Sequence, residues 1–424
     1  MKKEFKRFDM KKKVKRMIWP FRLIRVMLGT SSYRKHKPQI EKINMEGLEK
    51  GPYLLLCNHN AFLDFAIAMK AIYPAVPNFV VAIDGYLHRE WVMRNLGCIC
   101  KRKFTNDISI LRQMKRVIDN KDVVALYPEA KYSLCGTTAV LPKSTGKLCK
   151  FLNVPVVTLI CHGHHINSPF FNLDERGVCP TKATLKQILT VEDIKNKSVD
   201  EINRIIVENF QYDEYKWQKE NNVEINYEQR AKGLQKVLYK CPHCLTENRM
   251  SGVGNKLTCT SCGKTWSVSK LNELSADDGN TEFSHIPDWY EWERKCVREE
   301  IEKGTYSSGV LRVRVDSLPN PKKFITLGYG TLVHDMNGFK VELTDIDGDH
   351  QEMIKTVPSL YSCHIEYDYL GKNGDCVDLN TTEDTWYCFP DGNDFSVTKM
   401  ALATEELFIK NKKDNGFVVE DGLA

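Results

Sequence analysis

The most constraining stretch of this chain runs from Tyr53 to Lys70, where a strand pattern gives way to a helix pattern across a polar turn. Tyr53–Cys57 is a short apolar run of strand length, and the apolar residues after the turn recur on one face of a helix. The turn between them reads Asn58-His59-Asn60-Ala61-Phe62-Leu63-Asp64. A buried strand that leads directly into a helix is typical of α/β domains.

His59 and Asp64 in this turn are predicted to lie side by side. If Asn60 is the N-cap of the helix, His59 and Asp64 occupy the two positions whose side chains meet in a hydrophobic staple. An ionised carboxylate that holds one ring nitrogen leaves the other nitrogen free as a general base. Because the chain contains no Gly-x-Ser-x-Gly elbow, the substrate would supply the hydroxyl that this base activates. The alternative is a capped helix start with a hydrogen-bonded histidine and no chemistry.

Residues 46–228 are predicted to form one α/β domain with a mixed sheet flanked by helices. Four runs have the near-continuous hydrophobicity of strands that are covered on both faces. These runs are Tyr53–Cys57, Phe79–Ile83, Val123–Tyr127 and Pro155–Cys161. Helical patterns lie between and after them, at 108–118, at 147–152 and after the capping box at 198–201.

Three polar clusters are predicted to lie at strand ends within this domain. Lys101, Arg102 and Lys103 are successive cations that suit an anionic head group, or else form a solvated basic turn. Glu129 comes just after a buried strand, where it can accept a hydrogen bond from a substrate hydroxyl or pair with a basic group. The run His162-Gly163-His164-His165 is interpreted as an ordinary loop rather than a metal site, because no carboxylate stands nearby at ligand spacing.

These motifs resemble, in order and approximate spacing, the four sequence blocks of the glycerolipid acyltransferases, specifically the 1-acyl-sn-glycerol-3-phosphate acyltransferases. The blocks are Asn-His-x4-Asp at 58–64, the Gly-led basic block at 97–103, Tyr-Pro-Glu at 127–129 and Val-Pro-Val-Val at 154–157. The resemblance covers roughly residues 45 to 200. It implies transfer of an acyl chain from an acyl thioester, of coenzyme A or an acyl carrier protein, to the free hydroxyl of a lysophospholipid. The expected acceptor is 1-acyl-glycerol-3-phosphate, and the expected pathway is phospholipid biosynthesis.

The resemblance also implies roles for individual residues. His59 would be the general base, Asp64 would orient and charge-stabilise its ring, and Glu129 would position the acceptor. The block at Lys101–Lys103 would bind the glycerol phosphate. The third block usually continues Glu-Gly-Thr-Arg, whereas this chain has Glu-Ala-Lys-Tyr, so Lys131 is the nearest replacement for the usual cation. Two alternatives remain open: a catalytically inactive lipid-binding adaptor and an acyl-thioester hydrolase.

The N-terminal arm, residues 1–45, is predicted to bind an anionic membrane surface. Residues 1–37 carry a charge of +12, so the remainder of the chain sums to −6 of the net +6. The apolar residues Met17, Ile18, Phe21 and Ile24 follow helical spacing, which is typical of segments that lie flat on a bilayer. The apolar run is shorter than the roughly 20 residues of a spanning helix, so we expect a peripheral protein on the cytoplasmic face.

Two other observations concern the partners of the chain and the redox state of its compartment. The arm interleaves aliphatic side chains rather than stacking aromatic ones, so no nucleic-acid partner is expected, and a solvated basic helix is the remaining alternative. The fifteen cysteines are odd in number and mostly scattered singly among apolar neighbours. That distribution is typical of a reducing compartment rather than of a secreted disulfide framework.

Residues 229–270 resemble a zinc ribbon. Cys241 and Cys244 form one Cys-x2-Cys knuckle and Cys259 and Cys262 form a second, with fourteen residues between the two knuckles. Four such thiolates can converge tetrahedrally on one ion. Structural zinc is the expected cofactor, and iron in a rubredoxin-like site is the alternative. His243, inside the first knuckle, is interpreted as a turn residue.

The remainder of the chain is predicted to be a linker and helix at 271–305 followed by a β-rich domain at 306–424. Short alternating runs separated by turn signals give six or seven antiparallel strands before a final helix at 397–409. This arrangement resembles a pleckstrin-homology-like barrel, and a β-sandwich is the alternative. The run at 345–349 mimics a calcium loop but has Thr356 at the twelfth position, so a hairpin turn is expected. These C-terminal modules are candidates for binding a protein partner.

Overall fold

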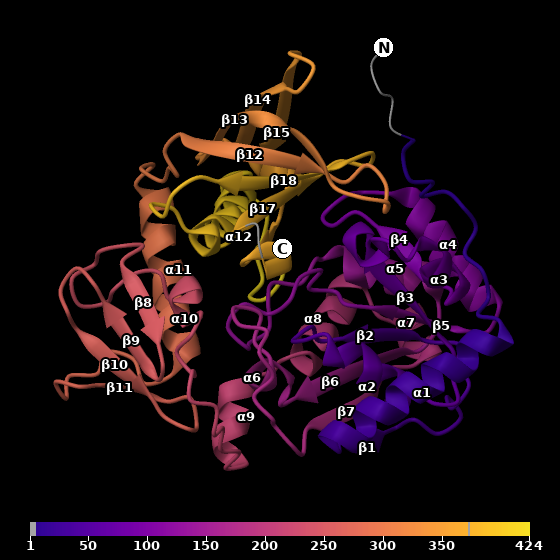
Figure 1. Cartoon of the computed structure of the whole chain (residues 1–424). Coiled ribbons are helices and arrows are strands. Elements are labelled where there is room, and N and C mark those ends of the chain that lie inside the picture. Colours follow the sequence, from indigo (N-terminus) through magenta and orange to yellow (C-terminus); the bar gives the residue numbers. More distant parts are fainter. Residues whose placement is uncertain (1–5, 372–373) are drawn as a thin grey trace.

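The computed structural model of the chain describes residues 6–371 and 374–424, except for the side chains of residues 25, 26, 28 and 29. The basic residues predicted at positions 1–5 of the arm lie outside the described residues. Figure 1 shows an N-terminal α/β domain in indigo to magenta, a small sheet in the middle of the chain, and a C-terminal sheet with its helix in orange to yellow. Among the described residues, no helix combines the length and the apolar character that crossing a bilayer requires.

The α/β domain is built on a seven-stranded mixed sheet of order β1-β7-β6-β2-β5-β3-β4. Its strands are β1 Gln39–Ile43, β2 Leu54–Cys57, β3 Pro77–Ala82, β4 Ile99–Lys101, β5 Val123–Leu126, β6 Val156–His162 and β7 Lys182–Leu189. Only the pair β6–β7 is antiparallel, so the predicted mixed sheet is confirmed. Because β1 belongs to this sheet, the α/β domain begins before the predicted boundary at residue 46.

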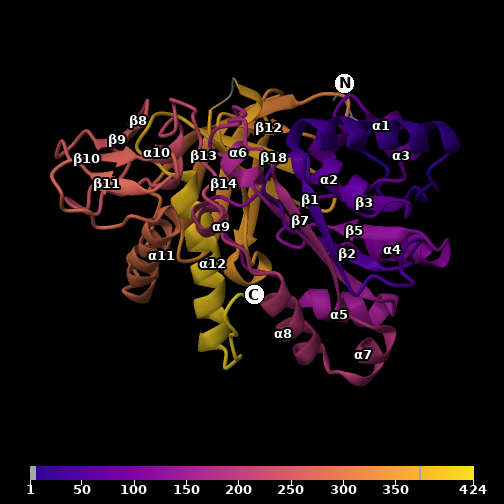
Figure 2. The same cartoon turned by 90° about the horizontal axis from the view of Figure 1, so that it is seen from below.

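Helices cover both faces of this sheet. Alternate residues of β2 explain why: Leu55 and Cys57 join one core cluster, and Leu54 and Leu56 join another on the opposite face. Figure 2 shows α1, α2 and α3 on the first face and α4, α5, α7 and α8 on the second. The helices of the domain are α1 Trp19–His36, α2 Leu63–Ala71, α3 Glu90–Asn95, α4 Ile108–Asp119, α5 Ser144–Leu152, α6 His164–Asn167, α7 Val191–Asn196, α8 Val199–Asn209 and α9 Glu214–Glu220, with the 3-10 turn η1 at Ile83–Tyr86.

The cysteine motifs belong to a small four-stranded antiparallel sheet of order β11-β10-β9-β8. The elements here are α10 Leu234–Val237, β8 Met250–Val253, β9 Lys256–Cys259, β10 Thr265–Val268, β11 Leu274–Ala276 and α11 Ile286–Glu302. Trp266 of β10 packs edge-on against Trp289 of α11, with ring centroids 4.9 Å apart. Because β11 pairs with β10, the sheet extends past the predicted boundary at residue 270, into a segment that the sequence had suggested was a linker.

The C-terminal module, residues 306–424, contains a seven-stranded antiparallel sheet of order β15-β14-β13-β12-β18-β17-β16. Its elements are β12 Leu311–Ser317, β13 Ile325–Asp335, β14 Gly338–Asp345, β15 His350–Thr356, η2 Val357–Ser359, β16 His364–Glu366, η3 Tyr369–Gly371, β17 Cys376–Asn380, β18 Thr385–Pro390 and α12 Val397–Asp414. The antiparallel strands and the final helix confirm those predictions, and the turn between β14 and β15 is a hairpin, as expected. The pleckstrin-homology-like barrel stays a prediction.

The end of the chain returns to the α/β domain. Leu423 is 3% exposed in the same core cluster as β2 residue Leu54, and it forms a parallel β-bridge with Leu141. The backbone of residues 422–424 exchanges three hydrogen bonds with that of residues 141–143. The C-terminal module is therefore connected to the α/β domain by packing as well as by covalent linkage.

Candidate active site

His59 and Asp64 meet at the start of α2. The Nδ1 atom of His59 lies 3.3 Å from Oδ2 of Asp64, which confirms that the two side chains are neighbours. The predicted cap is wrong, because α2 begins at Leu63 and its N-cap residue is Phe62 rather than Asn60. The turn is instead closed by the carboxylate, since Oδ2 of Asp64 accepts hydrogen bonds from the backbone N–H groups of Asn60 at 2.6 Å and of Ala61 at 2.9 Å.

The Asp64 carboxylate is held ionised although it is only 1% exposed. Burial opposes its charge, but hydrogen bonds from His164 and His59, together with the attraction of those rings, lower the pKa of Asp64 to about 2. An ionised Asp64 draws the proton of the His59 ring to Nδ1, which leaves the lone pair on Nε2. That tautomer is the one in which His59 can accept a proton from a substrate.

The ring of His59 packs against two tyrosines, one in the Tyr-Pro-Glu block and one three residues after it. Its centroid is 4.0 Å from the ring of Tyr127 and 4.0 Å from the ring of Tyr132. Its side chain remains 21% exposed. Burial lowers the pKa of His59 below its ordinary value of 6.5, although the hydrogen bond to Asp64 acts in the opposite direction. The imidazole is therefore a neutral base near pH 7.

His164 is a member of this site that the sequence analysis interpreted as part of an ordinary loop. Its Nδ1 atom lies 2.5 Å from Oδ1 of Asp64, on the oxygen that does not contact His59. The signal that could have identified it is topological: β6 lies beside β2 in the sheet and runs parallel to it, so the residues that follow the two strands meet at one edge.

Asp64, Cys161 and His164 also form a cluster whose ligand-type atoms lie within 4.8 Å of one another. The separation of 2.5 Å between Asp64 and His164 is that of a charge-assisted hydrogen bond. Two ligands that each lie ~2.0 Å from a tetrahedral zinc ion are about 3.3 Å apart. This cluster is therefore a hydrogen-bonded group rather than a metal site.

Glu129 supports the turn that carries His59. One carboxylate oxygen accepts from the backbone N–H of His59 at 3.1 Å, and the other accepts from the N–H of Ala139 at 2.7 Å and from the hydroxyl of Tyr212 at 2.9 Å. Glu129 is 1% exposed, and burial raises its pKa to about 7 despite these donors. These contacts are with backbone and Tyr212, and the predicted role of Glu129 in helping to position the acceptor stays a prediction.

Arg102 and Lys131 were predicted to bind the substrate phosphate, and their contacts contradict this. Arg102 is 2% exposed, and its guanidinium donates four hydrogen bonds to the C-terminal module. The acceptors are the carbonyls of Leu318, Pro319 and Glu383 and the hydroxyl of Thr385. Lys131 is 6% exposed, and its ammonium bonds to Ser362 at 2.9 Å and to Glu405 at 2.5 Å. Both cations hold the C-terminal module on the α/β domain.

Lys103 is the predicted cation whose charge acts on His59. Its ammonium is 2.7 Å from Nε2 of His364 and 3.8–3.9 Å from the carboxylates of Asp84 and Asp378. Burial opposes the Lys103 charge, but the nearby carboxylates outweigh it and raise the pKa of Lys103. The same charge contributes to the lowered pKa of His59. Lys101, at the end of β4, is half-buried, and burial lowers its pKa.

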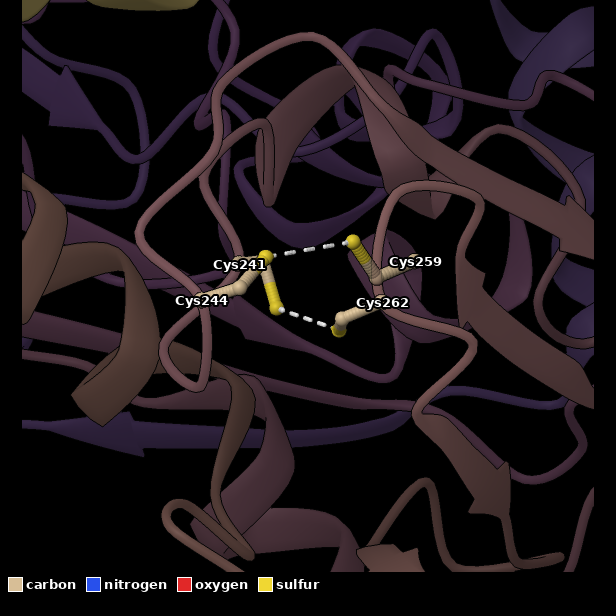
Figure 3. A group of neighbouring side chains, drawn as sticks. All are labelled: Cys241, Cys244, Cys259 and Cys262. Atoms are coloured by element: carbon tan, nitrogen blue, oxygen red, sulfur yellow. Dashed lines mark hydrogen bonds between the residues drawn. The ribbon is translucent and has the colours of Figure 1, made fainter.

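The four cysteines of the two knuckles point toward one another from two loops (Figure 3). Sγ of Cys241 is 3.9 Å from that of Cys262, and Sγ of Cys244 is 3.7 Å from that of Cys259. A zinc ion with four Zn–S bonds of ~2.3 Å separates its sulfurs by about 3.8 Å. The donor set therefore fits tetrahedral zinc. His243 is turned to Glu282, at 3.7 Å, rather than to the sulfurs.

Comparison with known proteins finds a family model and a solved structure to which this chain is similar. Residues 39–162 match the model of the family described as Acyltransferase, which confirms the resemblance of the four sequence blocks. The chain is also similar to the crystal structure of the 1-acyl-sn-glycerophosphate (LPA) acyltransferase PlsC from Thermotoga maritima. The two share 18% identity over 45% of this chain and 76% of that chain, with a TM-score of 0.37. A search of curated proteins finds no match.

Proposed function

We propose that this protein transfers an acyl chain from an acyl thioester to the free hydroxyl of a lysophospholipid, because residues 39–162 match the model of the Acyltransferase family. The observation that supports this most is the contact of 3.3 Å between His59 Nδ1 and an ionised, buried Asp64. This contact leaves Nε2 of a partly exposed, neutral imidazole as the proton acceptor.

The reaction can be written with these residues alone. Nε2 of His59 takes the proton of the acceptor hydroxyl as its oxygen attacks the thioester carbonyl carbon. The C–S bond then breaks, and the imidazolium returns the proton to the departing thiolate, so the products are an ester and a thiol. Asp64 orients the ring and stabilises its transient positive charge. No covalent acyl-enzyme is formed in this scheme.

We propose 1-acyl-glycerol-3-phosphate as the acceptor and coenzyme A or an acyl carrier protein as the donor carrier. Arg102, Lys103 and Lys131 all contact the C-terminal module, but Lys103 is the one whose charge acts on His59. We therefore assign Lys103 to the acceptor phosphate, with Lys101 as a second cation of the same block. The test uses the purified full chain, the lyso-acceptor and a labelled acyl thioester. Diacyl product that disappears in His59→Ala supports the proposal, and undiminished product in that variant refutes it.

A lipid-binding adaptor is the second candidate, and one observation favours it. Two of the cations predicted for phosphate binding serve instead as buried contacts of the C-terminal module. Lipid binding without turnover over a panel of lyso-acceptors would identify this function. Release of free fatty acid in the absence of any acceptor would instead identify a thioester hydrolase.

We further propose that the face formed by α1 and its neighbours lies on an anionic membrane. Trp19 and Met27 of α1 are each 70% exposed, and Phe62, three residues after His59, is 75% exposed. Trp91 of α3 is 69% exposed and packs against Phe21 of α1. Exposed aromatic side chains together with a basic segment are typical of proteins that bind at a membrane interface.

Vesicle sedimentation tests this membrane face. Wild type should bind vesicles that contain anionic lipid, and binding should weaken with salt because screening reduces the attraction of the basic arm. Trp19→Glu should reduce binding. Val310→Glu is the matched control, since Val310 is 72% exposed on the C-terminal module. Equal loss in both variants, or equal binding to neutral vesicles, would contradict the proposal.

We also propose that Cys241, Cys244, Cys259 and Cys262 hold one structural zinc ion. The sulfur separations of 3.7–3.9 Å support this. The metal would supply part of the folding free energy of the small sheet. Elemental analysis of the purified chain should find one zinc per molecule, and Cys259→Ser should lose it. Stoichiometric iron, or no bound metal, would refute the assignment.

A further inference from the structure

His164 is buried in a way that its packing alone does not explain. The residue is 0% exposed, and its Nε2 atom has no hydrogen-bond partner among the described residues. Burying an unpaired imidazole nitrogen costs free energy that an apolar side chain of similar size avoids. The compensating contact is on the other side of the ring, where Nδ1 lies 2.5 Å from Oδ1 of Asp64.

The Asp64 carboxylate consequently has donors on both oxygens. Oδ2 receives the backbone N–H groups of Asn60 and Ala61 and faces Nδ1 of His59. Oδ1 faces His164. The contacts at Oδ2 fix the position of one oxygen, but the carboxylate can still turn about that oxygen until Oδ1 is held as well. A second donor on Oδ1 removes that freedom.

Hydrogen bonds join the segment that carries His59 to the segment that carries His164. Asn58, which directly precedes His59, donates to the carbonyl of Cys161 at 2.9 Å and accepts from the N–H of the same residue at 2.8 Å. Cys161 is in β6, three residues before His164. Gly163 then takes a φ of 87°, a left-handed conformation that turns the chain back toward α2.

We propose that His164 is a positioning residue for acyl transfer: by donating to Oδ1 it fixes the plane of the Asp64 carboxylate, so that Oδ2 stays aimed at Nδ1 of His59. This inference rests on the proposed function, because the orientation of the Asp64 carboxylate is measured through the rate of acyl transfer. His164 needs no contact with acceptor or donor. It acts on the reaction through Asp64 and His59.

The test compares three variants of the full chain. His164→Leu removes the donor. His164→Asn keeps one, because the amide nitrogen of Asn stands where Nδ1 stands in the ring. His165→Leu is the matched control, since His165 is equally buried but contacts the hydroxyl of Tyr215, at 3.3 Å, rather than Asp64.

The expected result separates positioning from folding. His164→Leu should lower kcat ~10–100-fold, as is typical of outer partners that orient a functional group, with little change in KM for the acceptor. His164→Asn should recover most of kcat. The acidic limb of the pH profile, which reports protonation of His59, should move to higher pH in His164→Leu, because a carboxylate that no longer bonds to His164 stabilises the protonated His59 ring more strongly. His165→Leu should leave the limb in place.

The other outcomes distinguish a failure of the positioning role from a failure of the proposed function. If wild type is active but His164→Leu and His165→Leu lose activity only in proportion to their folded fractions, with an unmoved acidic limb, the positioning role is refuted alone. If wild type transfers no acyl group, the proposed function fails and the positioning role with it. Proton NMR still tests the contact itself, since a ring N–H bonded to a buried carboxylate gives a strongly downfield resonance, and its absence from wild type would refute the hydrogen bond.

Discussion

Glu405 of α12 is the residue whose replacement most directly tests how the C-terminal module is held on the α/β domain. It is 2% exposed, and its two oxygens face two cations, Lys131 at 2.5 Å and Arg294 of α11 at 2.7 Å. The hydroxyl of Ser362 adds a third donor at 2.8 Å. One carboxylate therefore joins three segments that are far apart in the sequence.

Two arguments give the size of the effect of Glu405→Gln. Burial opposes the charge of Glu405, but Lys131 and Arg294 outweigh it and lower its pKa from 4.5 to about 2. That difference corresponds to ~3 kcal/mol of folding free energy. Independently, removing one partner of a buried ion pair costs roughly 3–5 kcal/mol, because the other charge stays buried. Glu405→Gln should therefore lower the free energy of unfolding by about 3 kcal/mol near pH 7.

The pH dependence of this effect has a definite sign. Because the folded-state pKa lies below the ordinary value, the Glu405 contribution is complete above about pH 4.5 and is lost as pH falls toward about 2. The difference between wild type and Glu405→Gln should be equal at about pH 7 and pH 5.5, and smaller at about pH 3.5.

Urea denaturation followed by circular dichroism measures these differences. Glu406→Gln is the control: Glu406 is 3% exposed, but its closest partner, Arg298, has a side chain that is 47% exposed, so that cation can be solvated when the carboxylate is lost. We expect a loss of about 1 kcal/mol there. A loss below about 1 kcal/mol in Glu405→Gln, or equal losses in the two variants, would refute the reasoning.

Two further predictions concern the site and the module contact. Arg102→Leu removes four hydrogen bonds to the C-terminal module, so it should reduce the free energy of unfolding by more than about 3 kcal/mol. The KM for the acceptor should stay unchanged in the folded fraction. A raised KM at unchanged stability would instead support a phosphate-binding role for Arg102. Since burial lowers the pKa of His59, the neutral base persists below pH 6.5, and the acidic limb of kcat/KM in wild type should have its midpoint below that value; a midpoint above it would contradict the assignment of His59 as base.

Strands could be predicted from the sequence where both faces of the sheet are covered. β2 has all four residues buried, and its unbroken apolar run was identified correctly. The edge strands β1 and β15 were missed, because they carry largely exposed, polar side chains: β1 reads Gln-Ile-Glu-Lys-Ile and β15 reads His-Gln-Glu-Met-Ile-Lys-Thr. Their pairing is fixed by backbone hydrogen bonds to an inner neighbour, which leave no apolar period in the sequence.

The contact between His59 and Asp64 could be predicted because the two residues lie five positions apart on one turn. Local geometry brings them together whichever residue begins the helix, so the prediction was correct although the N-cap was not. His164 lies 100 residues beyond Asp64 and could be found only from the strand order, which places β6 beside β2. Single-sequence periodicity predicts elements but not their neighbours in a sheet.

The predicted phosphate-binding cations also show that a sequence does not reveal which distant residues a side chain contacts. Arg102 and Lys131 stand in blocks that resemble those of the acyltransferase family, yet their partners lie more than 200 residues further along the chain, at Thr385 and Glu405. A cation flanked by the same neighbours can meet a phosphate or a buried carboxylate, and only the three-dimensional arrangement decides which. The C-terminal module takes these two cations out of solvent, so their charges are matched by carbonyls, hydroxyls and the Glu405 carboxylate of that module. The module contact therefore depends on Arg102 and Lys131, and we expect variants of these two residues to alter stability rather than KM for the acceptor.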